Sequence, residues 1–194
     1  MRRLCVFCGS SSGRDPVYAA CARALGVELA VRGVGLVYGG GRVGLMGEVA
    51  DAALAAGGQV TGVIPQALVD AELAHCGVAD LRVVASLHER KALMAELSGG
   101  FVALPGGLGT VEELSEVLTW AQLGLHRKPC GVLNVRGYYD AFLALLDRAV
   151  TDGFLSAEHR AIVTVAGSPD ELLDAFARYE PPRPKWDRPA TSPP

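Results

Sequence analysis

Short runs of uninterrupted apolar residues alternate along this chain with segments of helical periodicity. A strand that is apolar at every position is buried on both faces of its sheet. Such strands, joined by helices, predict an α/β protein with a doubly wound parallel sheet of Rossmann type. Strands are expected at residues 4–8, 34–38, 59–64, 81–85, 101–104 and 131–135. Helices are expected at residues 16–31, through 48–54, at 87–97, 111–125 and 138–150, with a last helix after Ser168.

The chain length and the composition of its end bear on domain organisation. With 194 residues, half of them hydrophobic, the chain can bury one core and is too short for two. Residues 1–179 are therefore expected to form a single domain. Beyond Glu180, the run Pro181-Pro182-Arg183-Pro184 and the final Pro193-Pro194 predict a disordered tail over residues 180–194.

Charge, hydropathy and cysteine spacing argue against several classes of protein. The formal net charge is −3, so neither nucleic acid nor an anionic membrane surface is expected as a partner. No apolar run reaches the ~18–20 residues that would span a bilayer, and the N-terminus lacks the pattern of a secretory signal, which favours a cytoplasmic protein. Cys5 and Cys8 have the spacing of a metal or redox pair, but strand residues three apart face opposite sides. We interpret both as buried small apolar residues and expect no metal site.

Three turns rich in glycine or serine follow predicted strands, at residues 9–12, 39–42 and 105–110. The carboxyl ends of parallel strands lie at one edge of the sheet, and folds of this class bind their ligands there. We therefore expect the three turns to converge on one crevice.

The turn at residues 105–110 is the most informative of the three. An apolar strand stops at Pro105, the chain turns through three glycines, and a helix is expected to begin at Thr110. Glycines let backbone N–H groups approach an anion closely, and the N-terminus of the helix adds roughly half a positive charge. This turn predicts a site for the phosphate of a nucleotide.

Glu113, one turn into that helix, has two interpretations. Thr110-x-x-Glu113 has the form of a capping box, a local device that stabilises a helix start and needs no catalytic role. Alternatively, the carboxylate acts on the substrate, since a carboxylate beside a phosphate would otherwise only repel it. The second interpretation suggests chemistry on the sugar of a bound nucleotide.

The run Gly39-Gly40-Gly41-Arg42-Val43-Gly44 matches the dinucleotide fingerprint G-x-G-x-x-G. It follows the second predicted strand, and the third strand ends without an acid that could hold a ribose hydroxyl, which argues against NAD. The glycines serve either a tight turn with close helix packing or a second backbone contact to an anion or a sugar. Neither glycine turn is followed by the Lys-Ser or Lys-Thr of a Walker A site.

Two adjacent cations, Arg90 and Lys91, lie near the start of the helix expected at residues 87–97. Cations at that end oppose the helix dipole, so they need another reason to be there. Either they belong to a solvated charged face, or Arg90 points into the crevice and orients a phosphate or the Glu113 carboxylate. A planar guanidinium suits that second task.

Taken together, these segments resemble the LOG family, the cytokinin riboside 5′-monophosphate phosphoribohydrolases that were long mislabelled lysine decarboxylases. The resemblance covers residues 4 to about 179 and implies a modified Rossmann fold, a homodimer, and neither a metal nor an organic cofactor. The apolar helix at residues 111–125, which carries Trp120, is a plausible interface. The matching motifs are Cys5-Val6-Phe7-Cys8-Gly9-Ser10-Ser11, Val37-Tyr38-Gly39-Gly40-Gly41, Gly44-Leu45-Met46-Gly47, Gly62-Val63-Ile64-Pro65, His88-Glu89-Arg90-Lys91-Ala92, Pro105-Gly106-Gly107-Leu108-Gly109-Thr110-Val111-Glu112-Glu113 and Thr119-Trp120-Ala121-Gln122-Leu123-Gly124.

Carried over position by position, the family's catalytic pair falls on Arg90 and Glu113. The resemblance implies hydrolysis of the N-glycosidic bond of adenosine 5′-monophosphate, with or without an N6 side chain, to free base and ribose 5-phosphate. Nothing around the lysines resembles a pyridoxal phosphate site, so the decarboxylase label finds no support. The family's substrate contacts fall on Glu72, Arg90, Lys91, Gly107, Leu108, Gly109, Thr110, Val111, Glu112, Glu113 and Thr119.

Three other functions are left open by the residues. The first is a less selective purine or pyrimidine nucleotide phosphoribohydrolase. The second is a non-catalytic carrier of a phosphorylated cofactor such as molybdopterin, and the third is a dehydrogenase. The combination of Arg90 with Glu113 favours a hydrolase over a carrier, because simple binding of an anion would not require that pair.

Overall fold

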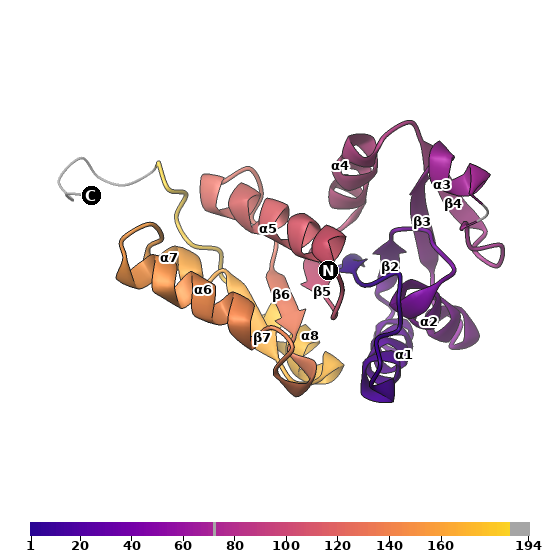
Figure 1. Ribbon diagram of the computed structural model, residues 1–194, viewed down its shortest axis with the longest axis horizontal. Helices are drawn as coiled ribbons and strands as arrows, with labels where there is room; N and C mark the ends of the chain where they lie inside the picture. Colours follow the sequence, from indigo (N-terminus) through magenta and orange to yellow (C-terminus); the bar gives the residue numbers. More distant parts are fainter. Residues whose placement is uncertain (72, 187–194) are drawn as a thin grey trace.

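The computed structural model describes residues 1–71 and 73–186, and in that part of the chain seven strands form one parallel sheet (Figure 1). The strand order is β4-β3-β2-β1-β5-β6-β7, and every neighbouring pair runs parallel. The expected α/β architecture with a doubly wound sheet is therefore confirmed. The strands are β1 (Arg3–Phe7), β2 (Gly35–Tyr38), β3 (Val60–Pro65), β4 (Asp80–Val84), β5 (Phe101–Ala103), β6 (Cys130–Leu133) and β7 (Val163–Ala166).

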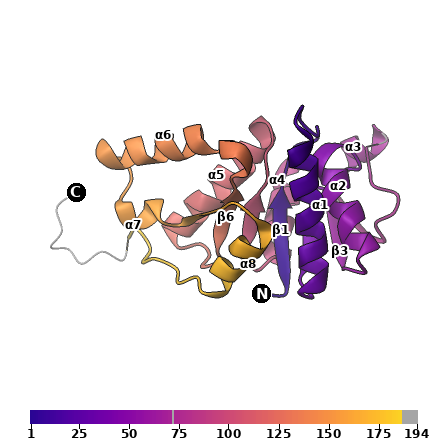
Figure 2. The same ribbon diagram turned by 90° about the horizontal axis from the view of Figure 1, so that it is seen from below.

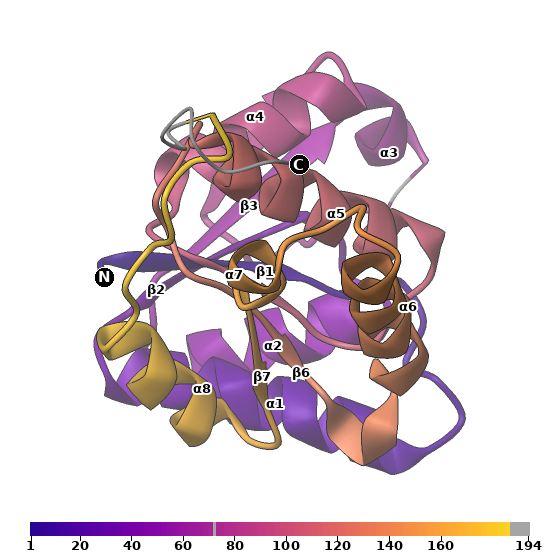
Figure 3. The same ribbon diagram turned by 90° about the vertical axis from the view of Figure 1, so that its left-hand side faces the viewer.

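Helices cover both faces of the sheet, which makes three layers (Figures 2 and 3). One face carries α1 (Pro16–Val31), α2 (Gly44–Ala55) and α8 (Pro169–Ala177). The other carries α4 (Leu87–Leu97), α5 (Leu108–Leu123) and α6 (Asp140–Thr151). The shorter elements are α3 (Gln66–Asp70), the 3-10 helix η1 (Val135–Gly137) and α7 (Ala157–Arg160).

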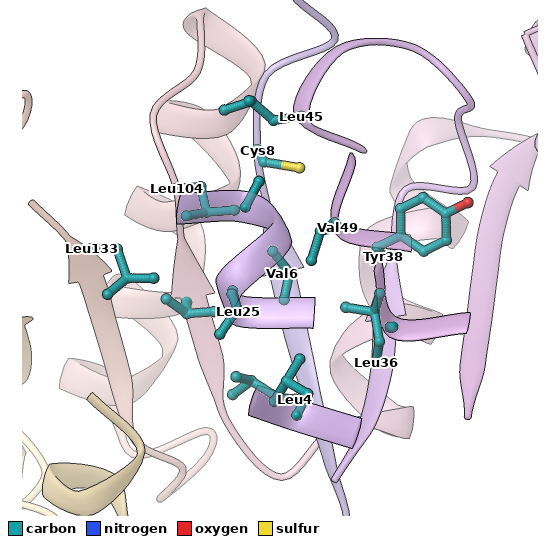
Figure 4. Close-up of a cluster of buried hydrophobic side chains, with 14 of the residues drawn as sticks. Leu4, Val6, Cys8, Leu25, Leu36, Tyr38, Leu45, Val49, Leu104 and Leu133 are labelled. Carbon is teal, nitrogen blue, oxygen red and sulfur yellow. The ribbon is translucent and has the colours of Figure 1, made fainter. Parts of the chain in front are cut away.

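The core is divided in two by the sheet, because successive strand residues point to opposite faces. In β1, Leu4 and Val6 join the cluster beneath α1 and α2 (Figure 4), whereas Cys5 and Phe7 join the cluster beneath α4 and α5. Cys8, just past the strand, lies on the Leu4 side and is buried like Cys5. Burial raises the pKa of both thiols. The interpretation of Cys5 and Cys8 as buried small residues on opposite faces is confirmed.

The order of the strands reverses at β1, which lies between β2 and β5. The chain builds outward from β1 to β4, then returns to place β5 on the other side of β1. Ligands of doubly wound sheets bind at the carboxyl ends of the strands at such a reversal. Here the turn after β1 adjoins the turn after β5, since Gly9 N donates a hydrogen bond to Pro105 O at 3.0 Å.

Two features at the level of elements differ from expectation. β7 was not predicted, and α5 begins at Leu108 instead of Thr110, with Gly107 as its N-cap residue and no side-chain capping bond. Thr110 is therefore inside the helix, where its side chain is buried. The capping-box interpretation of Thr110 and Glu113 is wrong, which removes the local explanation for Glu113.

The segment after α8 makes specific contacts as far as the structure describes it. Arg183 N donates to Glu158 Oε1 at 3.0 Å, and Lys185 N donates to Gln122 O at 3.0 Å. The first part of the tail expected to be disordered is thus attached to α7 and to the end of α5, while residues 187–194 lie outside the described residues. Within residues 1–71 and 73–186, no helix has both the length and the apolar character needed to cross a bilayer.

Candidate active site

A cavity of about 310 Å³ opens where the strand order reverses. Its floor is made by the turn at residues 9–13 and by residues 105–107, the two turns that follow β1 and β5. Leu45 from α2 and the rings of Tyr18 and Tyr138 complete the wall. Two of the three glycine-rich turns therefore converge on one crevice as expected.

The helix α2 approaches this cavity with its N-terminus. Leu45 N donates to Gly9 O at 3.0 Å, so the start of the helix is attached to the turn after β1. Gly44 has φ +59°, and a Cβ there would lie 2.3 Å from the backbone carbon of Ser10. Only glycine allows this combination of backbone angle and close approach.

The helix α5 presents unpaired amides at the same cavity. The first N–H groups of any helix have no partner within it. In the described part of the chain, the amides of residues 107–110 donate to no other backbone group. Gly107 and Gly109 are also open, because a Cβ at either would meet no atom within 4 Å. Unpaired donors at a helix N-terminus suit a phosphate.

Arg90 from α4 and Glu113 from α5 form an ion pair in which Arg90 Nη2 donates to Glu113 Oε1. The two side chains are 13% and 9% exposed, so the pair is largely shielded from water. Among the described residues, Arg90 Nε is buried and has no hydrogen-bond acceptor, which leaves this guanidinium with unused donor capacity. The interpretation of Arg90 as part of a solvated face is wrong, and its orientation toward Glu113 is as expected.

Burial and charge act on Glu113 in opposite directions. Burial raises the pKa of the carboxyl group, and the positive charge of Arg90 offsets only part of that increase. The neighbouring carboxylate of Glu112 raises the pKa further. A carboxylate with a raised pKa accepts a proton more readily than an ordinary one, which suits a general base.

The turn after β2 lies behind Arg90. A Cβ on Gly39 would come within 3.2 Å of Arg90 Nη2 and within 3.2 Å of Met46 Sδ. The glycines of this turn therefore serve close packing, and Gly39 leaves room for the guanidinium. Residues 39–41 do not line the cavity at residues 9–13 and 105–107, so the third turn does not join the other two there and the expectation of three converging turns is wrong.

The segment that follows Glu72 pairs with the same turn. Gly41 and Ala74 form an antiparallel bridge, and His75 N donates to Gly40 O at 3.0 Å. The buried His75 ring lies 3.0 Å from Asp51 Oδ1 through Nε2 and accepts from Gly77 N at 3.1 Å through Nδ1. This ring ties the segment to α2. Glu72 itself lies outside the described residues.

Lys91 points away from the carboxylate of Glu113. Its Nζ pairs with Glu112 Oε1 and lies 3.1 Å from Glu116 Oε1, and the side chain is 11% exposed. The consecutive residues Arg90 and Lys91 thus engage consecutive glutamates of α5. Three ion pairs between α4 and α5 hold the helix that carries Glu113 against its neighbour.

Known proteins are similar to this chain in sequence. A family model described as possible lysine decarboxylase matches residues 46–176. The probable cytokinin riboside 5′-monophosphate phosphoribohydrolase LOGL9 of Oryza sativa subsp. japonica is 54% identical over 180 residues, which cover 93% of this chain and 79% of that protein. This chain belongs to the LOG family. The cytokinin riboside 5′-monophosphate phosphoribohydrolase LOG7 of Arabidopsis thaliana is 51% identical, over 93% of this chain and 83% of its own.

Solved structures extend the likeness of this LOG family member to the fold. The molybdenum cofactor binding protein of Rippkaea orientalis superimposes with a TM-score of 0.69 over 91% of this chain and 96% of its own, at 21% sequence identity. At that identity the likeness concerns the fold alone. The modified Rossmann fold implied by the resemblance is therefore confirmed.

The residues expected to contact substrate in the LOG family do not all lie together here. Gly107 lines the cavity of about 310 Å³, whereas Arg90, Lys91, Thr110, Glu112 and Glu113 are not among its lining residues. Leu108 and Gly109 lie in the first turn of α5, and the Leu108 side chain is 91% exposed. Val111 is half-buried in the first turns of α5. Thr119 is apart from them: it lines a separate hollow of about 250 Å³ between α5, α6 and α7. There its hydroxyl donates to Ser115 O at 2.7 Å.

Two cavity residues were not anticipated from the sequence. Tyr18 comes from α1 and Tyr138 from the end of η1, and their rings meet edge to face with centroids 5.9 Å apart. Both lie in segments with ordinary amphipathic patterns, so no local signal distinguishes them from core tyrosines. Only the strand order, which brings the residues after β6 beside the β5 turn, reveals them.

Proposed function

We propose that this protein hydrolyses the N-glycosidic bond of adenosine 5′-monophosphate or of its N6-substituted derivatives, and releases the free base and ribose 5-phosphate. The single observation that supports this most directly is the shielded pair of Arg90 and Glu113 beside the glycine turn of α5. Relatives about 50% identical are named for this reaction on cytokinin riboside 5′-monophosphates.

Glu113 is the proposed catalytic carboxylate. Departure of the base builds positive charge on the ribose, and a negative group near the anomeric carbon stabilises that charge. The same carboxylate can accept the proton of the attacking water, since burial raises its pKa above that of an ordinary glutamate. Arg90 holds the carboxylate in place by its hydrogen bond, and its positive charge favours the ionised form.

The 5′-phosphate is proposed to bind at the start of α5. Gly107, Gly109 and Thr110 would supply backbone amides, and the helix dipole favours the negative charge. The phosphate lies far from the bond that breaks, so its binding energy serves to position the sugar. A nucleoside without the phosphate should therefore lose rate as well as affinity.

We further propose that the protein is a homodimer. The hollow between α5 and α6 is lined by Leu118, Phe142, Leu145 and Leu146, of which Leu145 is 63% exposed. Thr119 lies in that hollow as well. A second copy of the chain would cover this apolar surface. The cytoplasmic location expected from the sequence stays a prediction.

The direct test is incubation of the purified protein with AMP and with isopentenyl-AMP, with released base measured by chromatography. Hydrolysis of either gives adenine or its N6-isopentenyl derivative together with ribose 5-phosphate. Glu113→Gln keeps the shape of the side chain and its bond to Arg90, and we expect it to lower kcat at least about a hundredfold.

The matched control is Glu116→Gln, one turn further along α5. This residue carries the same functional group on the same helix but pairs with Lys91, 3.1 Å away, instead of Arg90. We expect its kcat to stay within about twofold of wild type, because Lys91 keeps its second partner Glu112 and the pair of Arg90 and Glu113 is left intact. Full activity of a folded Glu113→Gln protein would contradict the proposed role of Glu113.

The non-catalytic carrier is not favoured. Carrier proteins such as the molybdenum cofactor carrier protein of Chlamydomonas reinhardtii share the fold at 23% identity, whereas the relatives that share half of the sequence are named as hydrolases. An absence of base release from both nucleotides, with retained binding, would reverse this preference.

A further inference from the structure

Two consecutive tyrosines hold the end of β5 through their hydroxyl groups. Tyr138 Oη donates to Gly106 O, and Tyr139 Oη donates to Leu104 O at 2.7 Å. The Tyr139 ring is buried in the core, with 1% of its surface exposed. Tyr138 instead lines the cavity at the strand ends. The same chemical group thus makes one bond in the core and one at the candidate site.

The carbonyl that Tyr138 holds belongs to an unusually free peptide. The peptide joins Gly106 to Gly107, and neither residue has a Cβ to restrict rotation about its backbone bonds. Gly106 is itself required, because a Cβ there would lie 2.1 Å from Thr110 Oγ1 and 2.8 Å from Gly9 N. Because no side chain of Gly106 or Gly107 restricts this peptide, the hydrogen bond to its carbonyl fixes its orientation.

The orientation of this peptide matters because its other polar group is the Gly107 N–H. In a trans peptide the carbonyl of one residue and the N–H of the next point in opposite directions. By holding Gly106 O, the Tyr138 hydroxyl determines where the Gly107 amide points. That amide is the first of the unpaired donors of residues 107–110 in the described part of the chain.

Tyr138 is itself held in place. Its ring meets Tyr18 edge to face at 5.9 Å and Tyr139 edge to face at 5.2 Å. Asn134 Oδ1 accepts the Tyr139 N–H at 2.8 Å, which attaches the backbone of this segment to the end of β6. The hydroxyl therefore comes from a rigid support, as a group that orients another must.

We propose that Tyr138 is a positioning residue for the anion subsite: its hydroxyl holds the Gly106–Gly107 peptide so that the Gly107 amide faces the phosphate of a sugar phosphate. The inference deepens the proposed function and rests on its placement of the 5′-phosphate. It assigns to Tyr138 a role in affinity for the phosphate group and none in cleavage of the glycosidic bond.

The test compares Tyr138→Phe with Tyr139→Phe, each of which removes one hydroxyl that donates to a carbonyl of the same segment. Binding of ribose 5-phosphate is measured by isothermal titration calorimetry, which needs no turnover. We expect Tyr138→Phe to bind about fivefold more weakly, the factor typical of one lost hydrogen bond. Tyr139→Phe should bind like wild type and lose thermal stability instead, since its bond is buried.

Kinetics supply a second readout, because a loss of activity that depends on the phosphate group of the substrate would not follow from a merely structural role. With AMP, we expect Tyr138→Phe to lower kcat/KM by about the same fivefold factor. With adenosine, which has no phosphate, both variants should match wild type. Equal affinity of wild type and Tyr138→Phe for ribose 5-phosphate would overturn the proposal, as would an equal loss with adenosine.

The two proposals fail in different ways. If the wild-type protein binds ribose 5-phosphate and Tyr138→Phe weakens that binding, the positioning role stands even when no base is released from AMP. If wild-type protein releases base while the calorimetric affinities of the two proteins agree, the hydrolase stands and the role of Tyr138 is wrong. A wild type without affinity for ribose 5-phosphate overturns the anion subsite itself.

Discussion

At the scale of single residues, the site depends on how α4 and α5 bring Arg90 to Glu113. Burial disfavours the charged carboxylate, and the adjacent guanidinium favours it. Burial has the larger effect, so the pKa of Glu113 lies above that of an ordinary glutamate. The ionised form is the one that stabilises a cationic sugar. Activity should therefore rise with pH through this raised pKa.

Removal of the positive charge at position 90 should move that pKa further in the same direction. In Arg90→Gln the carboxylate loses its counter-charge, whereas burial still disfavours ionisation, so the pKa of Glu113 should increase. We expect the acid limb of kcat/KM to shift to higher pH by about one unit, a typical effect of an adjacent opposite charge. A ¹³C titration of the Glu113 carboxyl group checks this independently of activity. A shift to lower pH would contradict the account.

The same pKa bears on stability with a defined sign. Between the ordinary and the raised pKa, the folded protein binds more protons at Glu113 than the unfolded chain does. The contribution of this residue to the free energy of unfolding therefore falls as pH rises through that interval. Glu113 therefore lowers the free energy of unfolding at the pH where its ionised, shielded carboxylate serves the proposed reaction.

The pairing of Arg90 with Glu113 could be predicted, but the position of Thr119 could not. Cations at a helix start needed a partner, and a glycine turn followed by an acid offered one in the neighbouring element. Thr119 lies more than three turns beyond Gly107 along α5, so it lines a different hollow. Membership of a motif does not place its residues around one cavity.

At the scale of elements, strands were predicted well where they are buried on both faces. β1, β2, β3, β5 and β6 are apolar runs in the centre of the sheet, and each lies within two residues of its expected bounds. β7 was missed because it is an edge strand with Val165 exposed, and its four residues lack a continuous apolar pattern. The start of α5 was misplaced because Leu108 and Gly109 resemble a turn.

The start of α2 can contact the turn after β1 because residue 44 is a glycine. Gly44→Ala adds a Cβ only 2.3 Å from the Ser10 backbone at a residue with φ +59°. We expect a loss of about 3 kcal/mol or more in the free energy of unfolding, because both backbone strain and a collision result. Denaturant unfolding measures it, and a raised KM for AMP should accompany it, since the cavity wall moves.

Gly57 provides the matched control for that change. Its φ is +77°, but a Cβ there would meet no atom within 4 Å. Gly57→Ala should therefore cost only the strain of a left-handed residue, about 1 kcal/mol, and leave KM unchanged. Equal losses in the two variants would show that the approach of α2 to Ser10 adds nothing.

At the scale of the whole molecule, the distribution of apolar surface is uneven. α1 and α2 bury several residues each, whereas within the described chain α6 buries none. Leu145 on α6 and Phe154 just beyond it are 63% and 82% exposed. This side of the sheet therefore lacks the cover that the α1 side has, which is consistent with a partner seated on α5 and α6.

A charge placed on that surface should separate the proposed dimer. In Leu145→Lys an ammonium group would have to be buried without a partner on each side of the interface, so we expect a monomer. Sedimentation velocity at micromolar concentrations distinguishes the two states. The molar mass obtained for wild-type protein should be twice that of one chain. Val31→Lys is the control: Val31 is 75% exposed at the end of α1, on the opposite face of the sheet, so the same charge there should leave the dimer intact. A wild-type protein that stays monomeric over this range would contradict the proposed dimer.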